Sequence, residues 1–220
     1  MAARDRRRSA MRGLTEFQTE VARLFFTLPA SSGFLLAGGG ALLASGLTDR
    51  PTEDLDFFGE TGRSSVADAR DQLETAIIER GWTSVRVQDS KNFVRLRLIG
   101  DDELIVDIAI DSPAERPPVV SVVGPTFDPE ELAGRKLTAL FDRAAARDFA
   151  DVFVLAERFG TDVLLASAAE VDRGFDLPIL ATMLRTIDRF TDDELPPTGS
   201  TTEMVRAFFH RWADDLETPG

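Results

Sequence analysis

The sequence predicts an α/β (α+β) fold, in which a mixed-sheet domain at residues 1–125 precedes a C-terminal helical half at residues 126–220. Between residues 34 and 110, short runs with alternating apolar and polar residues are typical of β-strands. After residue 128 the apolar residues recur at helical spacing instead. The intervening segment, residues 112–129, is rich in proline around the apolar run 119–123, which predicts a loop with one edge strand before the helical half.

Composition restricts the classes of protein that this chain can represent. Its 220 residues are 43% hydrophobic and 29% charged, which is enough for one large domain or two small ones with a core. The absence of cysteine excludes disulfides and thiolate–metal sites. The formal net charge of −13 argues against a broad, nonspecific grip on nucleic acid, although a local basic patch remains compatible with it.

No apolar run approaches the length of a membrane span, so no membrane is expected as a partner. The basic N-terminus, residues 1–13, lacks the apolar stretch of a secretion signal and is expected to be a solvated end. The expected compartment is the cytoplasm.

The first expected elements surround a glycine-rich turn. An amphipathic helix at residues 14–28 is followed by an apolar strand at residues 34–37, the three glycines 38–40 and a short helix at residues 41–45. A glycine-rich turn that leads into a helix presents backbone N–H groups, which can bind phosphate.

An acid pair follows this turn. Asp54 and Asp56 lie in a strand-like run, and residues two apart in a strand project to the same face, whereas Leu55 and Phe57 point toward the core. Two adjacent carboxylates repel each other unless a cation lies between them, and hard oxygen ligands favour Mg²⁺. A phosphate-binding turn beside a metal-binding acid pair is typical of phosphoryl or nucleotidyl transfer.

A third acid, Asp107, lies in the last strand of an expected antiparallel meander. A helix at residues 64–80 precedes this meander, whose strands are residues 83–88, 93–99 and 103–110. Asp107 has apolar neighbours on both sides, so its carboxylate is expected near the centre of the sheet, where it needs a partner such as a metal. The alternatives are an exposed aspartate on an edge strand, or Asp111 as the third acid.

In the helical half, the spacing of charged residues sets a condition for a helical hairpin. A helix begins at Asp128 and Pro129, and further helices are expected at residues 161–173, 176–190 and 201–216. On one straight helix Lys136 and Asp151 would be about 22 Å apart, at 1.5 Å per residue. If both residues serve one site, the chain must break near residues 144–147 and fold back.

Two motifs resemble the AbiEii/MenT family of toxin nucleotidyltransferases, within the DNA polymerase β-like superfamily. The family's first pattern reads Gly-Gly-x-Ala-Leu, a spacer, and Arg-x-Ser/Thr-x-Asp-hydrophobic-Asp; residues 38–42 and 50–56 match it, with Gly39 and Thr52 as nucleotide-binding candidates. One departure is Gly40, where many relatives carry Ser or Thr, so that backbone amides would have to contact phosphate without a hydroxyl.

The second family pattern is Lys-Leu-x-Ala-Leu-x-x-Arg-x-x-x-Arg-Asp-x-x-Asp, and this chain matches it at Lys136, Arg143, Arg147, Asp148 and Asp151. The resemblance implies that Lys136 neutralises the triphosphate and that Asp151 orients Lys136 or holds a substrate. Arg143 and Arg147 would pair with Asp148 or reach phosphate, and Asp148 would cap the second helix. The alternative is a solvated helix face with ion pairs.

The resemblance further implies an enzyme that moves NMP from an NTP to an acceptor hydroxyl, with Mg²⁺ held by Asp54 and Asp56. Asp107 would be a further metal ligand or the general base, and the helical half would complete the active site. The acceptor would be a tRNA 3′ end, the outcome growth inhibition, and a cognate antitoxin the partner. Basic residues on the meander are candidates for an RNA surface or are ordinary strand charges: Arg86, Lys91, Arg95 and Arg97.

Two other functions remain open from the sequence. A small-molecule nucleotidyltransferase acting on an antibiotic would use the same acids, and the acidic composition would suit a cationic substrate. A catalytically silent nucleotide-binding module would bind NTP without releasing pyrophosphate, and the missing hydroxyl at Gly40 keeps this alternative in view.

Overall fold

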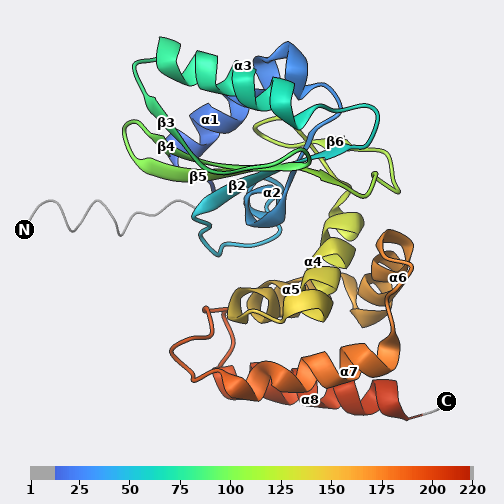
Figure 1. Cartoon of the computed structure of the whole chain (residues 1–220). Helices are drawn as coiled ribbons and strands as arrows, with labels where there is room; N and C mark the ends of the chain where they lie inside the picture. Colours follow the sequence, from blue (N-terminus) through green and yellow to red (C-terminus); the bar gives the residue numbers. More distant parts are fainter. Residues whose placement is uncertain (1–12, 219–220) are drawn as a thin grey trace, which may run out of the picture. The chain divides into compact units, whose positions relative to one another are not determined.

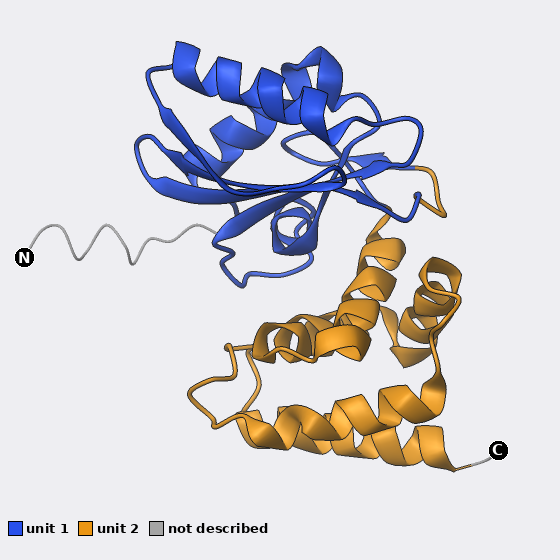
Figure 2. Ribbon diagram, viewed as in Figure 1, with its two compact units in different colours: residues 1–113, 118–127 blue, residues 114–117, 128–220 orange. Residues whose placement is uncertain are grey.

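The computed structural model describes residues 13–218, which form two compact units (Figure 2). Unit 1 takes the described residues up to Pro113 together with Pro118–Phe127, and unit 2 takes Ala114–Pro117 and the described residues from Asp128 onward. The solvated end expected at the N-terminus falls on residues 1–12, outside the described range. The chain passes from unit 1 to unit 2 at two places, after Pro113 and after Phe127.

Unit 1 is built on a seven-stranded mixed sheet in the order β3-β4-β5-β2-β1-β7-β6. β2 runs parallel to β5 and antiparallel to β1, and β3, β4 and β5 form the expected antiparallel meander. The strands are β1 (Leu35–Ala37), β2 (Asp54–Glu60), β3 (Thr83–Asp89), β4 (Phe93–Ile99), β5 (Glu103–Asp111), β6 (Val119–Val120) and β7 (Pro125–Thr126). The predicted mixed α/β fold is thereby confirmed.

The helices of unit 1 lie on both sides of this sheet, with α1 and α3 on one side and α2 on the other (Figure 1). They are α1 (Glu16–Thr27), α2 (Gly38–Ala44) and α3 (Val66–Glu79), with a 3₁₀ turn at Pro29–Ser31. Thr15 and Gln18 form a capping box at the start of α1, and the Ser65 side chain caps α3.

The alternation of buried and partly exposed side chains along β2 shows which face of the sheet carries the acid pair. Leu55 and Phe57 are fully buried, and the Phe57 ring stacks on Phe25 of α1 with the ring centroids 3.9 Å apart. Because side chains alternate along a strand, Asp54 and Asp56 project from the face opposite to α1.

The regular elements among the described residues of unit 2 are all helices. Its helices are α4 (Pro129–Arg143), α5 (Ala146–Phe159), α6 (Thr161–Val171), α7 (Leu177–Arg185) and α8 (Thr202–Glu217), with a 3₁₀ turn at Thr186–Arg189. Aromatic packing joins α5 to α8, where the rings of Phe149 and Phe209 meet edge to face at 5.0 Å. No helix among those described combines the length and apolar character needed to cross a membrane.

The short segment Ala114–Pro117 is held in unit 2 by Arg116. Its backbone N–H donates to the buried carboxylate of Glu131 at 3.0 Å, and its guanidinium pairs with Asp128, Glu130 and Glu170. These carboxylates raise the pKa of Arg116, mainly through the hydrogen bond with Glu130.

The expected break between two helices occurs at Ala144, which ends α4 in the left-handed conformation with φ of 44°. Ala145 is the N-cap of α5, and its backbone N–H donates to the Asp148 carboxylate at 3.2 Å. α4 and α5 therefore form a helical hairpin rather than one long helix, although the alanine run alone favours a continuous helix.

Candidate active site

The glycine turn packs directly against the acid pair. Gly38 has a positive φ of 61°, and a Cβ added to it would lie 1.9 Å from Oδ2 of Asp56. A Cβ at Gly39 would lie 2.7 Å from Oγ1 of Thr52. Glycine is required at both positions because the backbone approaches the neighbouring side chains too closely for any other residue.

Gly40 faces the interior of unit 1. A Cβ at this position would lie 2.9 Å from Cδ2 of Leu55, whose side chain is fully buried. A serine or threonine at residue 40 would therefore require Leu55 to move. The Leu55 side chain thus occupies the space that a side chain at residue 40 would need.

Three neighbouring strands place charged side chains in one row on the acid face. Asp56 of β2 is the register partner of Asp107 in β5, and Asp107 is the register partner of Arg95 in β4. Register partners on adjacent strands project to the same face. The structure thus brings Asp54, Asp56 and Asp107 together on one face, and it adds Arg95, which the sequence analysis named only as a candidate for an RNA surface.

Asp107 is buried on a central strand, so the alternative of an exposed edge-strand aspartate is wrong. Its partner is the Arg95 guanidinium, which donates from Nε to Oδ1 at 2.8 Å and from Nη2 to Oδ2 at 2.6 Å. This hydrogen bonding raises the pKa of Arg95, and the charges of Asp54 and Asp56 raise it further.

Thr52 connects the acid pair to the glycine turn. Its hydroxyl donates to Oδ1 of Asp54 at 2.6 Å, beside Gly39. Its backbone carbonyl accepts a hydrogen bond of 2.8 Å from Nε2 of Gln18, a buried residue of α1. Gln18 thereby positions Thr52, and no local motif in the sequence indicates this contact.

The donor set of unit 1 fits a cation that takes few protein ligands. Among the residues that the structure describes, no group of three or more histidine or acidic side chains is arranged to hold a metal ion. Mg²⁺ is commonly bound through one or two carboxylates, with the remaining positions filled by water and substrate phosphates. The paired oxygens of Asp54 and Asp56 suit that mode of binding.

Unit 2 contains the residues of the second motif as two ion pairs, one buried and one in which only the carboxylate is buried. Nζ of Lys136 lies 3.0 Å from Oδ2 of Asp151, and both residues are almost fully buried. Arg143 binds Asp148 through two hydrogen bonds of 2.9 Å, and Asp148 is fully buried. Arg147 is exposed.

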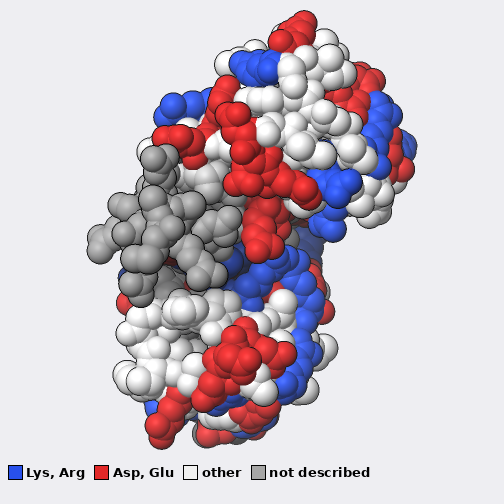
Figure 3. Space-filling model, turned by 90° about the vertical axis from the view of Figure 1, so that its left-hand side faces the viewer, with Lys and Arg blue, Asp and Glu red and all other residues white. Residues whose placement is uncertain are grey.

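The arginines of the meander are paired with carboxylates. Arg86 of β3 contacts Asp71, Glu74 and Asp89, which raise its pKa, and Arg95 is bound by Asp107. Arg97 lies 3.8 Å from the Glu103 carboxylate. Figure 3 likewise shows acidic and basic side chains next to one another on the visible surface. These contacts favour ordinary strand charges over a dedicated RNA surface.

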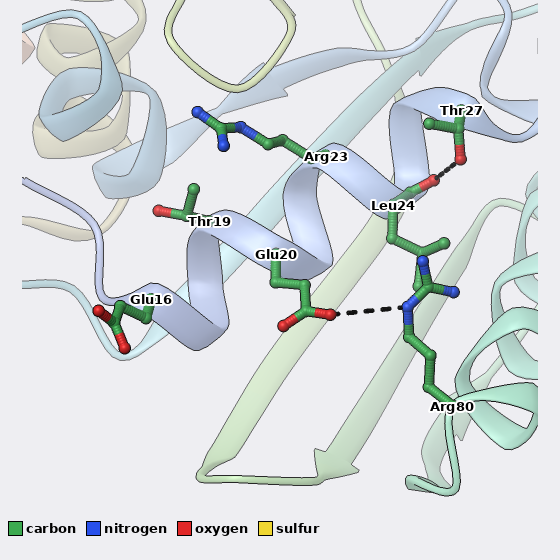
Figure 4. A pocket seen from close by; sticks show the side chains of 7 residues that line it. All are labelled: Glu16, Thr19, Glu20, Arg23, Leu24, Thr27 and Arg80. Atoms are coloured by element: carbon green, nitrogen blue, oxygen red, sulfur yellow. Dashed lines mark hydrogen bonds and ion pairs between the residues drawn. The ribbon is translucent and has the colours of Figure 1, made fainter.

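The open pocket drawn in Figure 4 lies apart from the candidate site residues. It is lined by Arg80 and by side chains of α1, and an ion pair of 3.7 Å between Arg80 and Glu20 crosses it. None of the candidate site residues lines this pocket.

Comparison with known proteins identifies the class of this chain as a nucleotidyltransferase. The sequence model described as "Nucleotidyl transferase AbiEii toxin, Type IV TA system" matches residues 22–215. The chain therefore belongs to the AbiEii family of toxin nucleotidyltransferases, as the two motifs predicted.

Solved structures with a similar fold include JHP933 from Helicobacter pylori, with 21% sequence identity and a TM-score of 0.59 over 93% of each chain. The nucleotidyltransferase toxin MenT4 from Mycobacterium tuberculosis H37Rv shares 16% identity, with a TM-score of 0.51, over 94% of this chain and 91% of that chain. No curated protein matches the sequence.

Proposed function

We propose that this toxin nucleotidyltransferase moves NMP from an NTP to the 3′ hydroxyl of a tRNA and thereby inhibits growth. The carrying observation is that Asp54 and Asp56 project to one face directly against the turn at Gly38. This arrangement places two acids beside a backbone that carries no side chains, which suits a triphosphate and its cation.

The proposed cation is Mg²⁺, held by Asp54 and Asp56. When bound, it would neutralise the phosphates and stabilise the in-line transition state. Thr52 fixes the orientation of Asp54 through its 2.6 Å hydrogen bond. The backbone N–H groups of Gly39 and Gly40 are the proposed phosphate donors.

Asp107 is proposed as a further metal ligand or as the general base. As the base it would accept the proton of the acceptor hydroxyl while the new O–P bond forms at the α-phosphate. The bond from the α-phosphorus to the bridging oxygen would break, and pyrophosphate would leave with the electron pair. Arg95 holds both oxygens of Asp107, so either role requires a change in that pair.

For unit 2 we propose that Lys136 acts on the triphosphate as a point charge. The Asp151 carboxylate fixes its ammonium group at 3.0 Å, and an ammonium carries three N–H donors. The Arg143–Asp148 pair secures the turn between α4 and α5, and the exposed Arg147 is the candidate for a further phosphate contact.

The proposed partners are a tRNA acceptor and a cognate antitoxin, and the proposed compartment is the cytoplasm. Membership of a type IV toxin–antitoxin family supports the antitoxin. The paired arginines of the meander do not add support for the tRNA, which therefore rests on the resemblance to MenT-type toxins.

A labelling experiment tests this function. The protein is incubated with each α-³²P-labelled NTP, Mg²⁺ and total RNA, and the labelled product is identified on a denaturing gel. Label in the tRNA band, lost in the Asp54→Asn variant, is the expected result. Label transferred to an antibiotic but not to RNA would favour a small-molecule enzyme, and NTP binding without pyrophosphate release would indicate a silent module.

A further inference from the structure

We propose that Arg95 is a built-in counter-cation of the active site, which holds Asp107 when no metal is bound and releases it when a divalent cation and nucleotide enter. In this role Arg95 is a positioning residue that sets the affinity of the site for its metal. The inference rests on the proposed metal site at Asp54 and Asp56 and extends it to Asp107 and Arg95.

The geometry of the pair supports a cation substitute. Both Asp107 oxygens are engaged by the guanidinium, at 2.8 and 2.6 Å. The Asp107 side chain is only 7% exposed, so its charge needs a nearby cation. A bidentate arginine supplies that charge and fixes both oxygens in one plane.

The same guanidinium acts on the other two acids. Asp107, which Arg95 holds, is the register partner of Asp56 on the adjacent strand, so the guanidinium lies on the same face as the acid pair and close to it. A dication placed between Asp54 and Asp56 would be repelled by the guanidinium charge. The Arg95–Asp107 pair therefore weakens metal binding, and a bound metal in turn destabilises the pair.

Arg95 also lies near an aromatic ring while it is paired with Asp107. Its side chain is 43% exposed, in contrast to that of Asp107. The guanidinium carbon lies 5.8 Å from the centre of the Phe93 ring, two residues earlier on β4. Because an aromatic face attracts a guanidinium, the Phe93 ring can retain Arg95 after it leaves Asp107.

The affinity of the full chain for Mn²⁺ tests the proposal without a measurement of activity. It is measured by electron paramagnetic resonance in the presence of a non-hydrolysable NTP. Arg95→Gln is expected to tighten Mn²⁺ binding roughly tenfold, because the Asp107 carboxylate is then free to bind the ion. Arg97→Gln is the matched control, since it removes the same charge two residues away on the same strand, and it should change the affinity less than about threefold at 0.15 M salt.

A second substitution shows whether the gain in Mn²⁺ affinity comes from the freed Asp107 carboxylate or from the loss of a positive charge alone. In the Arg95→Gln background, Asp107→Asn should abolish the gain in affinity, because the freed carboxylate is the new ligand. Arg95→Lys, which keeps the charge but not the bidentate contact, should give an intermediate affinity and provides the test if Arg95→Gln does not fold. An affinity unchanged or weakened in both Arg95 variants would overturn the proposal.

Release of Asp107 by Arg95 can also be followed directly in the wild-type chain. In a ¹⁵N NMR spectrum the Arg95 Nε–H signal should shift when Mg²⁺ is added with the NTP analogue, and an unshifted signal at saturation would contradict release.

The failures of the two proposals can be told apart. If neither the wild type nor any variant binds Mn²⁺, the metal site itself is wrong and the role of Arg95 falls with it. If the wild type binds Mn²⁺, Asp54→Asn loses it and the Arg95 variants match the wild type, then only the role of Arg95 is wrong.

Discussion

The ammonium group of Lys136 on α4 lies 3.0 Å from the carboxylate of Asp151 on α5, and both side chains are almost fully buried. The contact exists because the chain reverses at Ala144. A buried ion pair adds little net stability compared with apolar residues, but removing one partner leaves an uncompensated charge.

Lys136→Met should therefore destabilise the protein by about 3–5 kcal/mol, measured by urea unfolding. Lys91→Met is the matched control, because Lys91 is the other lysine of the chain and is exposed; it should change the free energy of unfolding by less than about 0.5 kcal/mol. Equal stabilities for the two variants would show that the buried pair is not important for the fold.

The double variant Lys136→Met/Asp151→Leu separates stability from a role in nucleotide transfer. Replacing both charges by apolar side chains should recover most of the lost stability. Transfer of labelled NMP should remain severely reduced, because the charge proposed to act on the triphosphate is absent. Full transfer by a stable double variant would remove Lys136 from the site.

Asp54→Asn and Asp56→Asn should each lower the rate of NMP transfer by at least about 100-fold, because each removes a proposed ligand of the metal. Circular dichroism and melting temperature should remain close to those of the wild type. Glu60→Gln is the control, since Glu60 lies on the same strand and the same face as the pair but outside the site. A comparable loss in Glu60→Gln would point to general charge rather than to metal ligation.

Gly38→Ala should disrupt the site, because its Cβ would overlap Oδ2 of Asp56. We expect a loss of transfer of about 100-fold, since displacement of a reacting group by about 1 Å has effects of that size. Gly46→Ala is the matched control. Gly46 has nearly the same backbone conformation, with φ of 64°, but no atom lies within 4 Å of the added Cβ. This variant should lose about 1–2 kcal/mol of stability from the left-handed conformation but retain transfer.

Gly40→Ser tests whether the hydroxyl of the family pattern would help this enzyme. Because the added Cβ would lie 2.9 Å from Leu55 in the packed core, the variant should be destabilised by about 1–3 kcal/mol. Transfer should not rise. Leu55→Val in the same background should restore part of the stability, and a more active variant of unchanged stability would show that the position is open to phosphate.

Much of this architecture follows from local rules of the sequence. Strand alternation correctly placed Asp54 and Asp56 on one face. The distance between Lys136 and Asp151 on a straight helix predicted a reversal if both residues serve one site, and the chain reverses at Ala144. Both inferences use only the geometry of a single element or of two consecutive ones.

The pair of Arg95 and Asp107 was missed, although its signal was present. The turn between β4 and β5 pairs Ile99 with Glu103, and counting back along the two strands leads to Arg95 opposite Asp107. The register of this hairpin therefore gives Asp107 a cationic partner within the protein.

Other contacts had no local signal. Leu55 fills the space next to Gly40, and Gln18 holds the carbonyl of Thr52. Both contacts join segments that are brought together only by tertiary packing, so neither the spacing nor the composition of the sequence reveals them.

The placement of Ala114–Pro117 affects how the chain can be divided. Arg116 belongs to unit 2 through its contacts with Glu131 and Glu170, yet Pro118–Phe127, which follows it, supplies β6 and β7 of unit 1. A single crossover between two related genes therefore cannot exchange one unit cleanly for its counterpart. Residues 114–127 contribute segments to both units, which favours inheritance of the two units together.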